Sequence, residues 1–182
     1  MIISLTGFMG CGKSSVGKAL AGRLGWEFTD LDEYIIHKKG MSIPEIFEQE
    51  GEEAFRAVEA ECLRDVVVMH QIAGGDAVLA LGGGTMCITS VRGLILNQTE
   101  CFWLKASLQN CLKRIGLDTT SRPILKMSVT EAPSVEELFA ERERIYSLAP
   151  HYINTDNSKE DDVVDIIRRE YGLRTVTSHI PE

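Results

Sequence analysis

The sequence lacks the features that mark a secreted or membrane protein. No cationic residue precedes the apolar run in its first ten positions, and none of its apolar stretches is long enough to span a bilayer. Its five cysteines form no Cys-x-x-Cys pair and no Cys/His cluster, so neither a disulfide framework nor a zinc site is indicated. We therefore expect a cytoplasmic protein with reduced thiols and no membrane partner.

An excess of positive charge is also absent. The 182 residues include 19 Lys and Arg against 27 Asp and Glu, which gives a formal net charge of −8. This charge disfavours sequence-independent binding to nucleic acid, so we expect no nucleic-acid partner. Any anionic ligand must be met by a local cluster of Lys and Arg side chains.

The composition and periodicity are those of a single α/β domain. With 44% hydrophobic and 25% charged residues, the chain is long enough for one domain with a substantial core. Short apolar runs alternate with segments of helical spacing, and this alternation predicts a parallel sheet with helices on both faces. The expected strands are residues 2–6, 27–29, 77–81, 100–104 and 151–155.

Helix signals occupy the intervals between these strands. One helix is predicted to open at Lys13 and to end at Gly25, a suitable left-handed cap. A second begins at Ser42, with Pro44 in its first turn, and the longest helical pattern runs from about residue 52 to residue 70.

Two segments lack periodicity. Residues 116–133 are rich in Thr, Ser and Pro, which is typical of a mobile loop. Residues 172–182 form a polar tail that we expect to fray, so the single domain is expected to cover residues 1–171.

The strongest motif is Gly7-Phe8-Met9-Gly10-Cys11-Gly12-Lys13-Ser14, a complete Gly-x-x-x-x-Gly-Lys-Ser phosphate-binding loop between an expected strand and an expected helix. In such a loop backbone N–H groups surround the β-phosphate, Lys13 reaches the β- and γ-oxygens, and Ser14 can join a Mg²⁺ shell. The motif therefore predicts a site for the phosphates of a nucleotide donor such as ATP, formed by Gly10, Cys11, Gly12, Lys13, Ser14 and Ser15. It does not identify the acceptor, because GTPases, transport ATPases and small-molecule kinases share it.

Two carboxylates follow the second expected strand. If the segment stays extended, Asp30 and Asp32 project to the same side, at the edge of the sheet where α/β proteins bind ligands. One could hold a water of the Mg²⁺ shell, and the other could take a proton from a substrate hydroxyl. Alternatively, Asp32 is the N-cap of a helix over residues 33–39.

Arg56 and Glu59 lie three residues apart on one helical face. A carboxylate that holds the guanidinium would suit Arg56 to bidentate binding of a substrate carboxylate or phosphate. A surface ion pair at the same spacing is the simpler alternative.

The third expected strand runs directly into Gly82-Gly83-Gly84. Most P-loop proteins have an acidic residue at the end of this strand, so three glycines indicate that some group approaches the main chain closely. A flexible turn is the alternative, but it explains one glycine better than three.

Two further arginines could act on a phosphoryl group. Arg122 stands in the irregular segment, and Arg142 lies in a helix expected over residues 134–146. Arginines on elements that close over a triphosphate stabilise charge on the transferring group, although either could be an ordinary solvated residue.

Taken together, these residues resemble the shikimate kinase family, from residue 2 to about residue 167. The resemblance rests on the phosphate loop, Asp30-Leu31-Asp32, residues 40–47 and 51–52, Phe55-Arg56 with Glu59, Leu81-Gly82-Gly83-Gly84, Arg122-Pro123, and Arg142 with Tyr146 four residues later. Its specific part is the triple glycine combined with Phe-Arg-x-x-Glu, since gluconate kinases resemble the chain only in the loop.

The resemblance implies a three-layer P-loop kinase fold with a five-stranded parallel sheet, a mobile lid at about 116–133 and substrate-binding helices at about 32–60. It also implies transfer of the γ-phosphoryl group of ATP to the 3-hydroxyl of shikimate, a step of aromatic amino-acid biosynthesis, with Mg²⁺ as cofactor. We expect the partners to be shikimate and MgATP, and the chain to be a monomer.

By position, the resemblance also assigns roles to individual residues. Asp32 would hold the ring hydroxyls and is the candidate base, Arg56 and Arg142 would bind the carboxylate, and Gly82, Gly83 and Gly84 would line the substrate. Asp30 and Ser14 would serve Mg²⁺, Lys13 and Arg122 would stabilise phosphoryl charge, and Arg114 would lie along the adenine.

Some positions depart from the family pattern and leave alternatives. Arg144 replaces an expected Pro and rivals Arg142 for the carboxylate, and Cys11 could make ATP binding sensitive to thiol oxidation. The acceptor could instead be gluconate or a nucleoside monophosphate, although we find no base-reading side chains between Asp32 and Arg56. A nucleotide-dependent switch is the non-enzymatic alternative.

Overall fold

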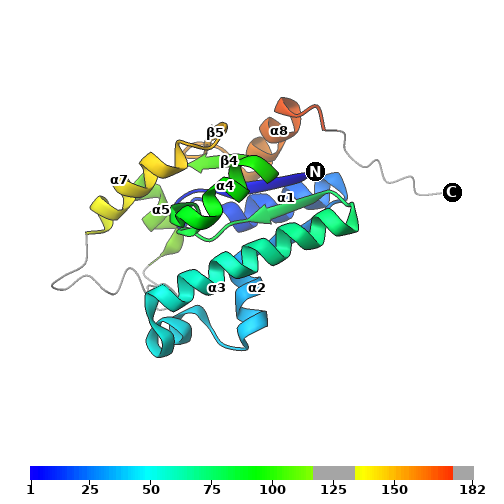
Figure 1. Ribbon diagram of the computed structural model, residues 1–182. Helices are drawn as coiled ribbons and strands as arrows, with labels where there is room; N and C mark the ends of the chain where they lie inside the picture. Colours follow the sequence, from blue (N-terminus) through cyan, green and yellow to red (C-terminus); the bar gives the residue numbers. More distant parts are fainter. Residues whose placement is uncertain (117–133, 174–182) are drawn as a thin grey trace.

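The computed structural model describes residues 1–116 and 134–173, arranged around a five-stranded sheet. The strands are β1 (Ile2–Thr6), β2 (Glu27–Asp30), β3 (Ala77–Ala80), β4 (Glu100–Lys105) and β5 (His151–Asn154). Neighbouring strands are parallel, in the order β2-β3-β1-β4-β5 (Figure 1). The five expected strands are confirmed, and each agrees to within one residue at either end.

Helices on both faces of the sheet complete the three layers that the resemblance implies. They are α1 (Lys13–Leu24), α2 (Leu31–Lys39), α3 (Ile43–Ala73), α4 (Thr89–Gln98), α5 (Leu108–Ile115), α7 (Val135–Tyr146) and α8 (Glu160–Glu170), with a short 3₁₀ turn η1 (Thr85–Cys87). α1 packs on α8 and against β3, whereas α3 packs on α4 and on α2. The lid expected at 116–133 and the tail expected at 172–182 fall almost entirely outside the described residues.

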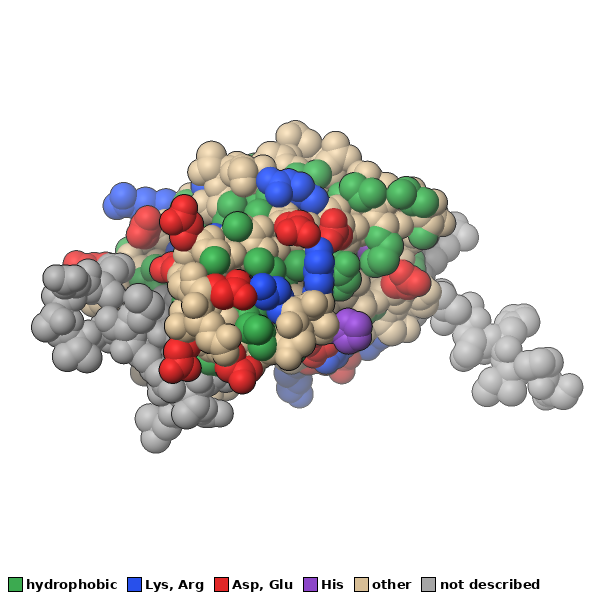
Figure 2. All heavy atoms as spheres, turned by 60° about the horizontal axis from the view of Figure 1, so that its bottom comes forward, with side chains coloured by type: hydrophobic (Ala, Val, Ile, Leu, Met, Phe, Trp, Pro, Cys, Tyr) green, Lys and Arg blue, Asp and Glu red, His purple; other side chains and the backbone are tan. Residues whose placement is uncertain are grey.

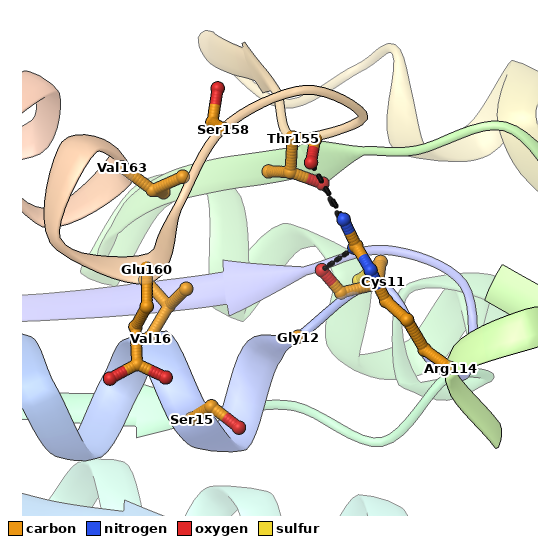
Figure 3. A pocket seen from close by; sticks show the side chains of 9 residues that line it. All are labelled: Cys11, Gly12, Ser15, Val16, Arg114, Thr155, Ser158, Glu160 and Val163. Atoms are coloured by element: carbon orange, nitrogen blue, oxygen red, sulfur yellow. Dashed lines mark hydrogen bonds between the residues drawn. The ribbon is translucent and has the colours of Figure 1, made fainter. Parts of the chain in front are cut away.

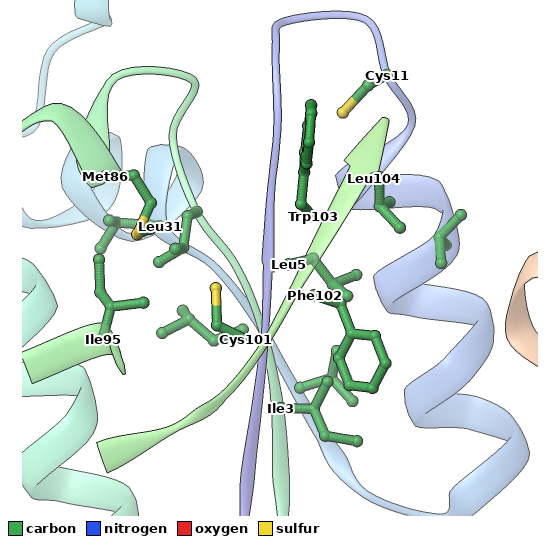
Figure 4. Packing of buried hydrophobic residues seen from close by; sticks show 14 of the residues in the cluster. Ile3, Leu5, Cys11, Leu31, Met86, Ile95, Cys101, Phe102, Trp103 and Leu104 are labelled. Carbon is green, nitrogen blue, oxygen red and sulfur yellow. The ribbon is translucent and has the colours of Figure 1, made fainter. Parts of the chain in front are cut away.

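The core fills the space on both sides of the sheet. Successive strand residues face opposite layers, so Cys101 lies on the side of Ile95 from α4 while Phe102 lies on the other side with Ile3 (Figure 4). All four side chains are completely buried. A strand covered on both faces reads as a continuous apolar run, which is why β1 and β3 were recognisable in the sequence.

The helix ends follow from local sequence. α1 ends at Gly25, whose φ of 70° is the left-handed conformation expected of a cap. α3 begins with a capping box in which Ser42 and Glu45 bond each other's backbone, and it contains one non-helical residue, Gly51, with φ 84° and ψ 172°. The predicted separation into a segment from Ser42 and a longer one from about residue 52 is therefore confirmed.

Charged side chains of both signs are interspersed with apolar ones on the face formed by α2 and α3 (Figure 2). Lys38 of α2, for example, contacts Glu61 at 2.8 Å and Asp65 at 2.7 Å on α3. Within the described ranges, no helix is both long enough and apolar enough to cross a membrane.

Candidate active site

The phosphate loop joins β1 to α1 in a conformation that depends on its glycines. Gly7, Gly10 and Gly12 have φ of 142°, 80° and 103°, values that side chains rarely allow. A Cβ at Gly7 would also lie 2.7 Å from the carbonyl oxygen of Leu104. Gly12 is the N-cap of α1 and provides no side-chain cap, so the helix presents its first N–H groups to the loop, as an anion site requires.

Lys13 is folded over the loop that precedes it. Its Nζ donates to the carbonyl oxygens of Gly7 at 2.9 Å and Phe8 at 3.2 Å. The ammonium group therefore lies over the loop itself, where phosphate oxygens would bind.

The expectation that Asp30 and Asp32 lie in one extended segment is wrong. β2 ends at Asp30, and α2 begins at Leu31, so residues 30 to 32 are not one extended segment. The N-cap of α2 is Asp30 and not Asp32, because Asp30 Oδ1 accepts from the backbone N–H of Asp32 at 3.0 Å and of Glu33 at 3.4 Å. A strand that leads directly into a helix needs its last residue as the cap.

The second oxygen of Asp30 contacts the phosphate loop. Ser14 Oγ donates to Asp30 Oδ2 at 2.5 Å, so the two residues expected to serve a metal are in direct contact. A hydroxyl and a carboxylate are hard oxygen donors, the kind that Mg²⁺ prefers.

Asp32 lies in the first turn of α2 and is half-buried. With Asp30, Leu81, Gly83 and Arg114 it lines a cavity of about 390 Å³ whose floor is the phosphate loop. The candidate base and the phosphate loop thus line one cavity. Asp32 reaches it from the first turn of α2 and not, as predicted, from an extended segment after β2.

Arg56 and Glu59 form a pair in which Glu59 is buried and Arg56 is partly buried, and not the surface pair that spacing alone allows. Glu59 is 1% exposed, and its Oε2 accepts from Arg56 Nη1 at 2.6 Å. Arg56 Nη2 also donates to Glu52 at 3.3 Å. Burial alone would lower the pKa of Arg56, but the charges of Glu59 and Glu52 outweigh it and raise that pKa, so the guanidinium remains charged.

The triple glycine is the surface against which these side chains pack. A Cβ at Gly84 would lie 2.7 Å from Arg56 Cζ, and a Cβ at Gly82 would lie 2.5 Å from Glu59 Oε1 and 2.8 Å from Asp32 Oδ1. The predicted close approach to the main chain is confirmed, and the approaching groups are the candidate site residues themselves.

Arg142 reaches the same turn from α7. It is 5% exposed and donates from Nη1 to the carbonyl oxygen of Gly83 at 3.3 Å, while the Tyr146 hydroxyl bonds the same oxygen. Burial raises the pKa of Tyr146, so its hydroxyl stays protonated and donates. Arg144 is exposed, because residues two apart on a helix point in different directions, so Arg142 and not Arg144 is buried at the glycine turn.

Arg114 lies beside the phosphate loop, at the edge of the cavity that Asp32 and Gly83 also line. Its guanidinium donates to the carbonyl oxygens of Thr155 at 2.7 Å and Cys11 at 3.2 Å (Figure 3). It lines a second pocket, of about 210 Å³, with Cys11, Gly12, Ser15, Val16, Thr155, Ser158, Glu160 and Val163. A guanidinium plane opposite two valines suits a flat aromatic base.

Two further residues named in the sequence analysis, Arg122 and Cys11, remain to be placed. Arg122 lies outside the described residues. Cys11 is 1% exposed, so its thiol is shielded from reagents in solution. Sequence analysis did not single out Thr85, whose hydroxyl bonds the Glu59 partner of Arg56, or Asp156, which accepts from the Ser107 backbone N–H at the start of the helix that carries Arg114. The available signal was their position, since each lies just beyond the carboxyl end of a strand, where ligand sites form.

Comparison with known proteins agrees with this arrangement. The family model described as shikimate kinase matches residues 9–171. A shikimate kinase of Moorella thermoacetica is 40% identical over 158 residues, 86% of each chain. One of Geobacter sulfurreducens is 41% identical over 164 residues, 89% of this chain and 86% of the relative.

Solved structures are similar over the same range. Shikimate kinase from Acinetobacter baumannii in complex with shikimate superimposes with a TM-score of 0.83 at 31% identity, covering 94% of this chain and 93% of the other. The Aquifex aeolicus enzyme gives a TM-score of 0.76 at 29% identity over 94% and 96% of the two chains. With a family model matching most of its length and relatives this similar, the chain belongs to the shikimate kinase family.

Proposed function

We propose that the chain transfers the γ-phosphoryl group of ATP to the 3-hydroxyl of shikimate, and that the residues described above carry out this reaction. The observation that supports the assignment most strongly is a shared cavity, in which the phosphate loop and Asp32 line the same space and two arginines, Arg56 and Arg142, adjoin its glycine turn. The Acinetobacter baumannii relative was solved with shikimate bound, which makes this acceptor the first to test.

On the donor side, the phosphate loop would bind the β- and γ-phosphates through its backbone N–H groups and Lys13. Ser14 and Asp30 would hold Mg²⁺, which when bound neutralises phosphate charge and orients the γ-phosphoryl group. Arg114 would lie along the adenine, in the pocket that it lines with Val16 and Val163. Arg122 would add positive charge during transfer.

On the acceptor side, the chemistry of the residues fits a small hydroxylated acid. The guanidinium groups of the partly buried Arg56 and the buried Arg142 lie at the glycine turn, and they would bind the substrate carboxylate. Asp32 would accept hydrogen bonds from the ring hydroxyls, and Gly82 to Gly84 would line the substrate with backbone.

The transfer itself is an in-line displacement. The 3-hydroxyl oxygen forms a bond to the γ-phosphorus while the bond from that phosphorus to the β,γ-bridging oxygen breaks, and ADP leaves. The hydroxyl proton goes to Asp32, and Lys13 stabilises charge on the equatorial oxygens. We also propose that residues 1–171 act as one catalytic domain in a monomer.

The test is ADP release in a coupled assay with MgATP and a panel of acceptors: shikimate, gluconate and nucleoside monophosphates. Turnover on shikimate with little on the others is expected, since paired arginines favour a carboxylate over a nucleotide and the family match favours shikimate over gluconate. Faster turnover on gluconate or a nucleotide would overturn the acceptor assignment, and ATP binding without turnover on any of them would overturn the enzymatic role.

A further inference from the structure

Thr85 lies behind the proposed shikimate site and has no side-chain role in the reaction described so far. It is the first residue of η1, directly after the triple glycine, and its side chain is completely buried. Its hydroxyl bonds Glu59 Oε1, the oxygen of that carboxylate that does not face Arg56. The two oxygens of Glu59 are thus held from opposite sides, by a hydroxyl and by a guanidinium.

This contact is decisive for Glu59 because a buried carboxylate must satisfy both of its oxygens. Thr85 Oγ1 also lies 3.1 Å from the carbonyl oxygen of Gly82, but a hydroxyl has one proton, and a charged carboxylate is the stronger acceptor. If the hydroxyl were missing, Glu59 Oε1 would be buried without this donor. The carboxylate would then rotate to recover a partner, and Arg56 would follow it.

The space around Gly82 makes such a rotation consequential. A Cβ placed there would lie 2.5 Å from Glu59 Oε1 and 2.9 Å from Thr85 Oγ1, with Asp32 Oδ1 at 2.8 Å. Asp32 and Glu59 are both acidic and converge on one point of the backbone. The Thr85 hydroxyl supplies a proton at that point, which lessens the repulsion between the two carboxylates.

We propose that Thr85 is a positioning residue for acceptor binding, which fixes the rotamer of Glu59 and through it the orientation of the Arg56 guanidinium. The inference rests on the proposed function, because it assumes that Arg56 binds the acid group of the acceptor. It adds a residue that contacts neither substrate and whose hydroxyl, not its size, is what the site requires.

The experiment compares Thr85→Val, which keeps the shape and loses the hydroxyl, with Thr85→Ser, which keeps the hydroxyl. Loss of a hydrogen bond to a buried carboxylate predicts a rise of about tenfold in KM for shikimate in Thr85→Val, with KM for ATP unchanged. Thr85→Ser should restore KM for shikimate. Thr89→Val, the same change at an exposed residue of α4, is the matched control. If Thr85→Val does not fold, Thr85→Ala replaces it in the comparison with Thr85→Ser.

Arg56→Ala, measured alongside, distinguishes the role of Arg56 in carboxylate binding from the role of Thr85 in positioning Arg56. If Arg56→Ala raises KM for shikimate and Thr85→Val does not, Thr85 has no positioning role and the proposed site stands. If Arg56→Ala leaves KM for shikimate unchanged, the carboxylate assignment is wrong and this inference fails with it. An equal rise in both KM values, or failure of Thr85→Ser to restore binding, shows a general packing role and also overturns the proposal.

Discussion

The two sides of the cavity present positive charge in different ways. On the phosphate-loop side, it comes from backbone N–H groups at the uncapped start of α1 and from Lys13, whose ammonium group bonds the loop itself. On the triple-glycine side, it comes from guanidinium groups that other elements hold in place, Arg56 by Glu59 and Arg142 by the Gly83 carbonyl. The first arrangement is contained in eight consecutive residues, and the second requires α3, α7 and the turn after β3.

This difference explains how an acidic chain can bind two anions. Each cluster of positive charge is local, and on the triple-glycine side the charge of Arg56 is paired with Glu59 and Glu52. The comparison also separates the expected effects of mutation: changes at the phosphate loop should reduce kcat, and changes at the glycine turn should raise KM for shikimate.

The largest effect is expected for Lys13→Ala. Removing a preorganised donor to the transferring phosphoryl group predicts a loss of roughly 10²–10³-fold in kcat, because the lost interaction is strongest in the transition state. The coupled ADP-release assay measures it. Lys18→Ala, on the exposed side of the same helix, is the control. Near-normal turnover of Lys13→Ala would show that Lys13 does not stabilise the transferring phosphoryl group.

The next effect tests the triple-glycine side. Arg142→Ala removes a buried charge-assisted contact and should raise KM for shikimate by about 10²-fold while KM for ATP stays within twofold, since each such bond contributes about 1.5–3 kcal/mol. Arg144→Ala, an exposed arginine two residues away, should change neither constant. The reverse pattern would transfer the carboxylate-binding role to Arg144.

The phosphate loop is formed by consecutive residues, whereas the triple-glycine side is assembled from distant elements, and this difference determines what could be predicted from sequence. The phosphate loop, the strands and the ends of α1 were recognisable because local sequence determines them: glycines with positive φ, apolar runs and a cap at Gly25. Asp30 was misplaced as part of an extended pair because a strand that passes into a helix without a linker leaves no signal of its own. The burial of Glu59 depends on contact with Thr85, 26 residues away, which helical spacing does not encode.

Gly84 offers a sharper test of how the glycine turn and Arg56 fit together. Its φ of −108° allows any residue, so Gly84→Ala adds a methyl group without backbone strain. The methyl group would meet Arg56 Cζ at 2.7 Å, and the end of a flexible side chain can move aside. We therefore expect a KM for shikimate raised by about tenfold, as a displaced guanidinium predicts, and a lowered Tm, because the buried Glu59 carboxylate loses part of its pairing.

The control for this change is Gly93→Ala on α4, where the nearest atom would be Asn97 Nδ2 at 3.9 Å. It should leave both KM values unchanged and slightly raise Tm, because Ala favours a helix over Gly. A Gly84→Ala enzyme with normal KM for shikimate would show that Arg56 need not lie against this glycine.

The smallest effect is expected on the nucleotide side, at Asp156. Its Oδ1 accepts from the Ser107 backbone N–H at 2.8 Å and from Asn110 Nδ2 at 2.7 Å, which ties the segment after β5 to the start of the helix that carries Arg114. Asp156→Ala should raise KM for ATP by about three- to tenfold with KM for shikimate unchanged, because hydrogen bonds of this kind contribute modestly at a partly exposed site. Asp65→Ala on α3 is the control, and a selective rise in KM for shikimate would contradict the prediction.

The pH dependence of stability provides a second measurement on Asp156. Partial burial opposes its charged form, but the bonds from Asn110 and Ser107 outweigh this and lower the pKa of Asp156 below the ordinary 3.8. A lowered folded-state pKa stabilises the fold above the unfolded value, and the contribution is lost as pH falls through the folded one. The difference in Tm between the wild type and Asp156→Ala should therefore be constant near neutral pH and shrink below 3.8. A Tm difference that persists in acid would mean that the contacts of Asp156 with Ser107 and Asn110 stabilise the fold through packing and not through the charge of the carboxylate.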